Sequence, residues 1–288
     1  MSRKLLGIVI GGSIGGLFFI FIMTLLFNPG IFLKSKIKEA LNRASKGRSQ
    51  VEDITFGWKR GIGLTNFILL QRDGKAPAIK ARNVRLKLAL MPLLRGQYIL
   101  RELEVTEVDM AKKLPFHSGT VANIFGVKAS QLAFTGELSR VKDTKGMNRP
   151  VGRGNIKLED GFLTGEIILA LMRGLGQSGE GYAFESISTN FEARPEGQVY
   201  LSNFLARGSL FDLELEGLFQ PDQTMDCNAT VILSKEKMGE NVQKIFGFSV
   251  TNTLRIPVKV QGSLSRPKIF IKTESLMDDL LKGIFKGK

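Results

Sequence analysis

The sequence predicts a mainly β protein: an N-terminal transmembrane helix precedes an antiparallel sheet with one solvated face, and a few short helices interrupt the strands. Three observations support this fold class. The first 30 residues contain one long uncharged apolar run. From Val51 onward, apolar and polar residues alternate in short stretches, which is the period of a half-buried strand. The 288 residues also include 32 glycines and 20 phenylalanines, a composition typical of strands joined by turns.

Composition narrows the functional classes. The net charge is +14, which suits nucleic acid, an anionic membrane surface or plain solubility. The basic residues are scattered along a chain that we expect to be membrane-anchored, so we expect no nucleic-acid partner. Cys227 is the only cysteine and His117 the only histidine. An intrachain disulfide is therefore excluded, as is any metal site that needs several histidines.

The segment from Leu5 to Phe27 is an uncharged apolar run that follows Arg3 and Lys4. It is long enough to cross a bilayer as a helix, which takes about 20 residues, whereas a cleavable signal peptide has an apolar core of only ~7–15. We therefore predict an uncleaved membrane anchor within residues 1–30. Its anchoring positions are Leu5, Ile10, Leu17, Phe21 and Phe27. Charge leaves its orientation open, since long domains translocate largely regardless of charge.

Residues 31–50 are predicted to contain a juxtamembrane amphipathic helix from Ile31 to Lys46. Its apolar face is formed by Leu33, Ile37, Ala40, Leu41 and Ala44. We expect its basic residues to lie at the membrane surface, where anionic headgroups attract each by about 1 kcal/mol. These are Lys34, Lys36, Lys38 and Arg43. A solvated polar face would give the same pattern.

The period changes to two in residues 51–143, the N-terminal β region, and in residues 155–273. Strands with one apolar face are predicted around Ile54, Val84, Leu103, Phe211 and Leu254. The opposite faces carry charged residues, as in an antiparallel sheet that is solvated on one side.

Helices are predicted at Glu166–Leu175 and Glu236–Phe246, and residues 274–288 are predicted to form a C-terminal amphipathic helix. Its apolar stripe comprises Leu276, Met277, Leu280, Leu281, Ile284 and Phe285. This stripe either covers one end of the sheet or docks on a membrane or a partner. Residues 144–154, TKGMNRPVGRG, are polar and bear glycine and proline, so we predict a loop or boundary there.

One short phrase occurs three times. It reads GIGLTNFIL from Gly61, GQVYLSNFL from Gly197 and, more weakly, GNIKLEDGF from Gly154. Apolar residues two apart share a strand face, so Asn66 and Asn203 are predicted on that face, where an asparagine marks a bend. Three diverged copies indicate repeated architecture rather than a catalytic motif. The function is therefore expected to lie on a surface.

The order of the anchor, the short helix, GIGLTNFIL and NVRLKLALMPLLRGQYILRELEV resembles the start of AsmA-family envelope proteins. Their hallmark is a strand, a Pro-Leu-Leu-x-Gly turn and another strand, seen here at Met91–Gly96. The stretch from Phe184 to Gly217 and the ending from Ile256 to Pro267 are similar to the AsmA-like C-terminal region, so residues 155–273 are assigned to it. The likeness covers nearly the whole chain except about Lys112–Arg153, although the chain is short for this family.

The resemblance implies a single-pass inner-membrane anchor with a cytoplasmic N-terminus, and the bulk of the chain in the periplasm of a Gram-negative envelope. It implies an elongated, curled sheet with an open apolar groove, related to bridge-like lipid-transfer proteins, and a role in phospholipid transport or outer-membrane assembly. A sandwich with two packed apolar faces would give the same strand pattern. The expected lipid groove consists of Ile54, Phe56, Trp58, Leu64, Val84, Leu86, Leu88, Leu103, Val105, Val199, Leu201, Phe211, Leu213, Leu215, Ile256, Val258 and Val260.

No catalytic or metal-binding constellation stands out. Gly174–Gly179 fits G-x-G-x-x-G, but it follows a predicted helix and precedes strands, unlike a dinucleotide site. We expect no enzyme activity and no cofactor, with membrane lipids as the main partner and phospholipid as the bound ligand. The alternative is a non-enzymatic scaffold that binds envelope-assembly or secretion proteins and is similar to type II secretion system protein N. In that case, the groove or the Leu276–Phe285 stripe binds a protein.

Overall fold

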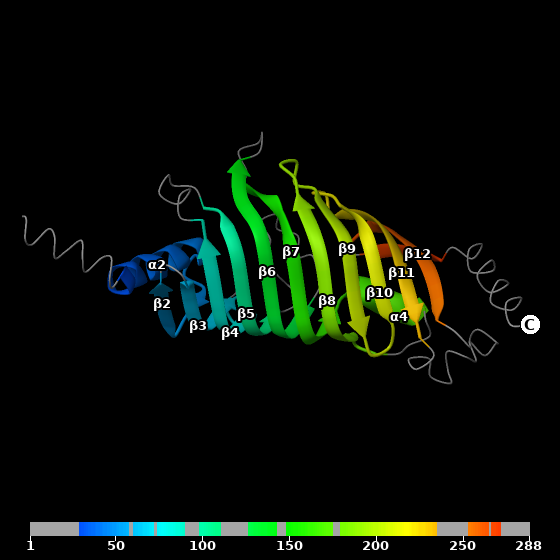
Figure 1. Ribbon diagram of the computed structural model, residues 1–288, viewed down its shortest axis with the longest axis horizontal. Helices are drawn as coiled ribbons and strands as arrows, with labels where there is room; N and C mark the ends of the chain where they lie inside the picture. The colour runs from blue at the N-terminus through cyan, green and yellow to red at the C-terminus, as the bar shows by residue number, and fades with distance from the viewer. Residues whose placement is uncertain are drawn as a thin grey trace, which may run out of the picture.

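The computed structural model describes residues 29–57, 60–71, 74–89, 98–110, 126–142, 148–174, 179–234, 253–264 and 266–271. Within these ranges the chain forms two helices, α2 (Pro29–Ser45) and α4 (Glu166–Gly174), and one 13-stranded sheet (Figure 1). No helix among the described residues is long and apolar enough to cross a bilayer. The predicted anchor and its residues Leu5, Ile10, Leu17, Phe21 and Phe27 lie outside the described ranges, as do the predicted helix Glu236–Phe246 and residues 272–288.

The strands follow one another across the sheet in almost the order of the sequence, and every pairing is antiparallel. They are β1 (Ser49–Gln50), β2 (Asp53–Gly57), β3 (Gly61–Leu70), β4 (Pro77–Leu88), β5 (Leu100–Met110), β6 (Gly126–Lys142), β7 (Asn148–Thr164), β8 (Tyr182–Ala193), β9 (Val199–Gly208), β10 (Asp212–Phe219), β11 (Thr224–Leu233), β12 (Leu254–Ser263) and β13 (Arg266–Ile271). Both β1 and β2 pair with β3, so the sheet begins there and ends at β13 without closing.

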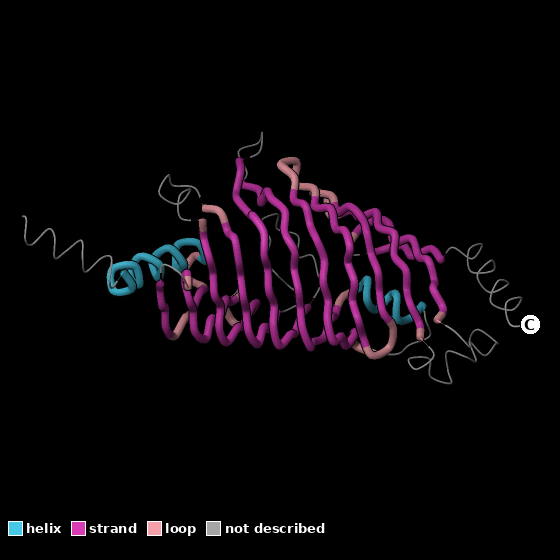
Figure 2. The backbone as a smooth tube through the Cα atoms, viewed as in Figure 1, coloured by secondary structure: helices cyan, strands magenta, loops and turns pink. Residues whose placement is uncertain are grey.

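The sheet is elongated and curled. Figure 2 shows the strands side by side along the long axis of the molecule and curving along their length. Helix α2 packs on β1 and β2 at one end, and α4 contacts β7 and β13 at the other. The predicted mainly β, antiparallel fold is therefore confirmed.

The register aligns one apolar row across eleven consecutive strands. Each residue of this row lies directly opposite the next: Ile54, Leu64, Val84, Val105, Leu132, Leu158, Ile187, Ala206, Leu213, Val231 and Ile256. All of them are buried except Leu132, which is partly buried. We call this side of the sheet the inner face. A one-residue slip in any strand would turn its apolar side chains outward, so burial of the row fixes the register.

The repeated phrase marks backbone irregularities, as predicted. Asn66, Asp160 and Asn203 have φ angles of 49°, 41° and 51°, in the left-handed region. All three side chains are exposed, so placing Asn66 and Asn203 on the apolar face was wrong. Each phrase contains an extra residue that resets the alternation. In β3, the inner-face residues are therefore Leu64 and then Phe67, three positions apart.

Strand β5 contains a fourth copy of the phrase, which lacks the glycine and the asparagine and was not predicted from the sequence. Glu107 in β5 has a φ of 51° and lies between Val105 and Val108, which both face inward. The register is the same on both sides of this position, because Asn83 pairs with Thr106 and Lys80 with Asp109. Asn66, Glu107 and Asp160 thus lie at one level of the sheet. Two successive outward residues at that level in each of these strands interrupt the alternation without shifting the register.

The short elements are partly as predicted. Helix α4 matches the predicted Glu166–Leu175, and its buried residues are Ile168, Leu171 and Met172. Residues 148–154, predicted as part of a loop, instead begin the 17-residue strand β7. The predicted boundary therefore falls within a continuous sheet. Gly152 and Gly154 replace apolar residues there, which hid the two-residue period.

Candidate functional site

The inner face brings together the residues predicted to line a groove. Some of the predicted groove residues belong to the row from Ile54 to Ile256. The others that the structure describes lie beside this row on the same face: Phe56, Leu86, Leu88, Leu103, Val199, Leu201, Phe211, Leu215, Val258 and Val260. Trp58 lies outside the described residues. The periodicity therefore identified the correct face for each strand that it detected.

The opposite, outer face carries cross-strand ion pairs. Arg85 and Glu104 lie 2.9 Å apart across β4 and β5, and Lys87 pairs with Glu102 beside them. Near the other end of the sheet, Arg255 reaches Glu214 at 2.5 Å across β11. These pairs are solvent-exposed and contribute little stability. Because of these ion pairs the outer face is polar and solvated, and the inner face is the apolar one.

The inner face is not equally covered along the sheet. From β3 to β10 its apolar residues on one side of the central row are mostly partly exposed. We call this set the apolar strip, and it comprises Ile62, Leu86, Leu88, Leu100, Leu103, Leu138, Ile156, Phe191, Val199, Leu201, Phe204, Leu215 and Phe219. Sequence reasoning missed its members on β6 and β7, because Gly136, Gly152 and Gly154 interrupt the alternation there. A large contiguous apolar patch on a protein surface often marks a binding region.

At the C-terminal end, the inner face is fully covered. The side chains that β11 and β12 place on the inner face are buried: Met225, Cys227, Ala229, Val231, Leu233, Leu254, Ile256, Val258 and Val260. The predicted groove residues Phe211, Leu213, Ile256, Val258 and Val260 belong to this region and expose almost no surface. They form an ordinary core with Ile168, Leu171 and Met172 of α4.

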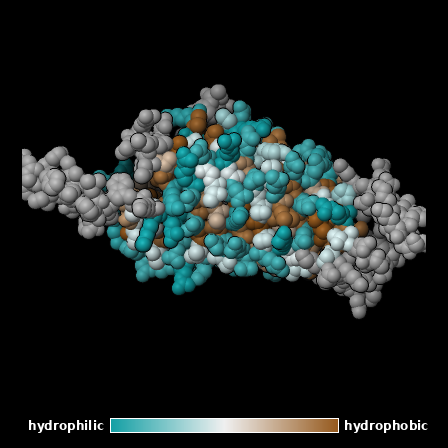
Figure 3. Space-filling model, viewed as in Figure 1, coloured by the Kyte–Doolittle hydropathy of each residue, from teal (hydrophilic) through white to brown (hydrophobic). Residues whose placement is uncertain are grey.

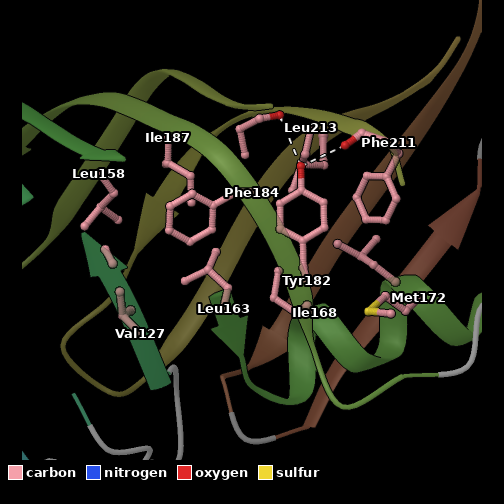
Figure 4. Close-up of a cluster of buried hydrophobic side chains, with 14 of the residues drawn as sticks. Val127, Leu158, Leu163, Ile168, Met172, Tyr182, Phe184, Ile187, Phe211 and Leu213 are labelled. Carbon is pink, nitrogen blue, oxygen red and sulfur yellow. Dashed lines mark hydrogen bonds between the residues drawn. The ribbon is translucent and has the colours of Figure 1, made fainter. Parts of the chain in front are cut away.

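Tyr182 is the polar element of that core (Figure 4). Its hydroxyl donates a hydrogen bond to the carbonyl oxygen of Phe211 at 2.8 Å, and the two rings lie 4.8 Å apart. Burial raises the pKa of the Tyr182 phenol, with smaller contributions from Asp212 and Glu185. The phenol therefore stays neutral and links the start of β8 to the segment that enters β10.

At the N-terminal end, α2 covers the sheet with Ile37 and Leu41, which pack against the core. Lys34 pairs with Asp53 of β2, and this hydrogen bond lowers the pKa of the Asp53 carboxyl. Glu39 accepts a hydrogen bond from Arg43 at 2.7 Å and lies 3.9 Å from Lys36. Lys38 is exposed. Three of the four predicted headgroup-binding cations thus have carboxylate neighbours, and Lys34 also fastens α2 to the sheet.

Depressions on the outer face include one of about 430 Å³ and one of about 330 Å³. The larger is lined by polar and apolar residues, among them Thr65, Arg85 and Phe56, and the smaller by residues that include Lys128 and Phe162. Within the described part of the chain, no three His, Cys, Asp or Glu residues are placed to hold a metal. Burial raises the pKa of the Cys227 thiol to about 11, so it is no nucleophile at neutral pH.

Figure 3 shows hydrophilic residues over much of one side of the molecule and a lengthwise band of hydrophobic residues across its middle. Comparison with protein-family models, curated proteins and solved structures finds no match to this chain. Its function is therefore inferred from the geometry of the sheet.

Proposed function

We propose that this protein is anchored in a membrane and binds phospholipid acyl chains on the curled inner face of its sheet, and so contributes to lipid transport or envelope assembly. The apolar strip carries this proposal. It offers partly exposed aliphatic and aromatic side chains on consecutive strands from β3 to β10, without an intervening charged residue on the same face. The resemblance to AsmA-family proteins supports an inner-membrane anchor and a periplasmic sheet.

The dimensions suit an acyl chain. Strands lie ~4.8 Å apart, so the seven spacings from β3 to β10 extend over roughly 34 Å. One leaflet of a bilayer has a hydrocarbon depth of ~15 Å, half of the ~30 Å core. The strip is therefore longer than one extended chain. Each buried methylene contributes about 0.8 kcal/mol, so a chain is held without a specific polar site.

The N-terminal helix supports a membrane-proximal position. Helix α2 carries four basic residues and one acidic residue. It follows directly after the predicted anchor, and anionic headgroups attract cations at that depth. In this arrangement the strip begins beside the bilayer, where lipid is available.

A second candidate is a scaffold similar to type II secretion system protein N. One observation favours it: β13 ends the sheet, and Phe270 and Ile271 on it are 51% and 44% exposed. An edge strand with exposed apolar residues is suited to pairing with a partner strand. The Leu276–Phe285 stripe lies outside the described residues and stays a prediction.

The test uses the full chain in vesicles that contain phosphatidylethanolamine with a photoreactive diazirine in its acyl chain. After irradiation, labelled peptides are mapped by mass spectrometry. We expect labels on β3–β10 as well as on residues 5–27. Leu86→Glu places a charge in the strip and should reduce strip labelling at least fivefold, because a buried carboxylate is costly.

The matched control is Asn228→Glu, which adds the same charge to an exposed outer-face position of β11. It should leave labelling unchanged. Labels confined to residues 1–28 would exclude acyl-chain binding by the sheet. Such a result, together with co-purifying secretion or envelope proteins, would favour the scaffold.

A further inference from the structure

The β6–β7 hairpin extends beyond its neighbouring strands next to the apolar strip. Strand β5 pairs with β6 only as far as Leu138, and β8 pairs with β7 only from Gly152 onward. The ladder between β6 and β7 continues past this level to the pair Lys142 and Asn148. Residues 139–142 and 148–151 therefore form a two-stranded ribbon that projects from the sheet, and Figure 1 shows the end of β6 rising above β5.

Two cations follow an apolar row of the strip onto this ribbon. The row pairs Leu88 with Leu100 and Leu100 with Leu138, and all three residues are partly exposed. Arg140 and Lys142 lie two and four residues beyond Leu138 in β6, so their side chains are on the same face as Leu138. Both are exposed. The apolar row therefore ends beside two positive charges on the inner side of the sheet.

These two cations differ from the ion-paired cations of the outer face. There, Arg85 lies 2.9 Å from Glu104, and similar pairs recur from β4 to β12. The residue opposite Arg140 is the uncharged Pro150. Within the part of the chain that the structure describes, Arg140 and Lys142 form no ion pair and no side-chain hydrogen bond. Residues 139–151 contain four basic residues and one acidic residue, so the ribbon favours an anion.

We propose that Arg140 and Lys142 bind the phosphate of a phospholipid whose acyl chains lie on the apolar strip, an inference that rests on the proposed function. Guanidinium and ammonium groups form charge-assisted hydrogen bonds with phosphate oxygens. Same-face residues of a strand are ~7 Å apart, so both side chains reach one headgroup. The lipid therefore enters across the long edge of the sheet at β6 and β7, and not through either end.

The length of an acyl chain fits this entry. A chain extends ~15 Å, the hydrocarbon depth of one leaflet, and this equals about three strand spacings of ~4.8 Å. From a headgroup at β6, a chain that runs along the strip reaches β3 on one side or β9 on the other. The strip ends at β3 and β10, so a headgroup near its middle lets a single chain length serve most of it.

Two photoreactive lipids test the phosphate site with the full chain in micelles of a non-ionic detergent, which contains no competing phosphate. One is phosphatidylglycerol and the other is diacylglycerol, which lacks the phosphate, and both carry a diazirine near the ester carbonyl. In the double variant Arg140→Gln/Lys142→Gln, we expect labelling of the strip by phosphatidylglycerol to fall about tenfold, because two headgroup-binding cations are lost. Labelling by diacylglycerol should stay within about twofold of the wild type, which also shows that the variant is folded.

Phosphatidylglycerol should label β6 and β7 of the wild type most strongly, since its diazirine lies close to the headgroup. Strongest labelling at β3 or β10 would overturn entry at the hairpin. Equal labelling of the wild type and the double variant by phosphatidylglycerol would overturn the headgroup site, as would an equal loss for both lipids.

The matched control is Arg207→Gln/Lys157→Gln, which removes the same two side-chain types from exposed outer-face positions of β9 and β7. It should leave labelling by both lipids unchanged. A loss as large as that of Arg140→Gln/Lys142→Gln would assign the effect to net charge and overturn the site.

Inorganic phosphate distinguishes a lipid headgroup from the free ion. It should displace little phosphatidylglycerol from the wild type, because the acyl chains supply most of the affinity. Complete displacement would identify a site for free phosphate and overturn the headgroup assignment. If neither lipid labels the strip of the wild type, the proposed function itself fails. If both lipids label the strip and the double variant changes neither, only the headgroup site fails.

Discussion

Replacing Asn203 tests whether the repeated phrase is needed for its backbone conformation. Asn203 has a φ of 51° in β9, where two residues face a single residue of both β8 and β10. For a residue with a Cβ, the left-handed region costs roughly 1–2 kcal/mol, and asparagine tolerates it through local hydrogen bonds. Asn203→Ala keeps the Cβ and lacks the asparagine side chain that makes this region tolerable, so we expect a loss of about 1 kcal/mol in the free energy of unfolding.

Asn203→Gly separates conformation from side-chain bonding. Glycine has no Cβ and adopts this region freely, but it costs about 0.5–1 kcal/mol through the entropy of the unfolded chain. We expect its unfolding free energy to stay close to that of the wild type. Asn66→Ala should cost a similar amount to Asn203→Ala. The two should add, because β3 and β9 are six strands and ~29 Å apart.

The assay is urea unfolding of the purified protein, followed by far-ultraviolet circular dichroism. Asn228→Ala is the control: it makes the same substitution on an exposed strand position that has no left-handed φ. It should stay within about 0.5 kcal/mol of the wild type. Equal losses for Asn203→Ala and Asn228→Ala would refute the conformational role. A glycine variant as unstable as the alanine variant would assign the effect to side-chain bonding instead.

Three further measurements test the packing of the core in the C-terminal half of the sheet. Tyr182→Phe leaves the buried carbonyl of Phe211 without its 2.8 Å donor and should cost about 1–3 kcal/mol in urea unfolding; a value below 0.5 would show that water or another group replaces the hydroxyl. Gly208→Ala would place a Cβ 2.3 Å from the Tyr182 ring and should lower the free energy of unfolding by about 1–3 kcal/mol. Gly57→Ala is the control and should lower it less, because its new Cβ is 3.6 Å from its nearest neighbour. Equal losses for the two variants would contradict the overpacking argument. The raised pKa of Cys227, about 11 against 9.0 in the unfolded chain, should make thermal stability fall as pH rises from 9 to 11, because the unfolded state loses its proton first. This part of the decline should be absent in Cys227→Ala, and an unchanged decline would assign it to other groups.

Much of the inner face was predictable because a strand has a fixed period. Leu86, Leu103, Leu213 and Val258 were each assigned to the apolar face from alternation alone, and the register places them there. The left-handed positions Asn66 and Asn203 were found through repetition of the phrase. Glu107 was missed, since glutamate carries no local signal for this conformation. Glu107 lies at the same level of the sheet as Asn66 and Asp160, so its left-handed φ angle belongs to the same interruption of the alternation.

The residues predicted to line a groove share one face of the sheet, and that face is not uniformly exposed. Leu86 and Ile256 follow the same alternation rule, yet one is partly exposed and the other is 1% exposed. Alternation reports which side of a strand is apolar, and it carries no information on what covers that side. Ile256 belongs to the same buried cluster as Ile168, Leu171 and Met172 of α4, and α4 contacts β13, almost 100 residues later in the sequence.

The sequence by itself determined the mainly β fold, the apolar face of each regular strand, the helix at Glu166–Gly174 and the bends at the repeated phrase. These depend on local periods and on backbone preferences within a few residues. The tertiary structure decided which part of the apolar face is covered, that the predicted boundary at 144–154 lies inside one sheet, and that Lys34 binds Asp53. Those outcomes depend on contacts between residues distant in sequence, since burial follows from how the sheet curls around its helices.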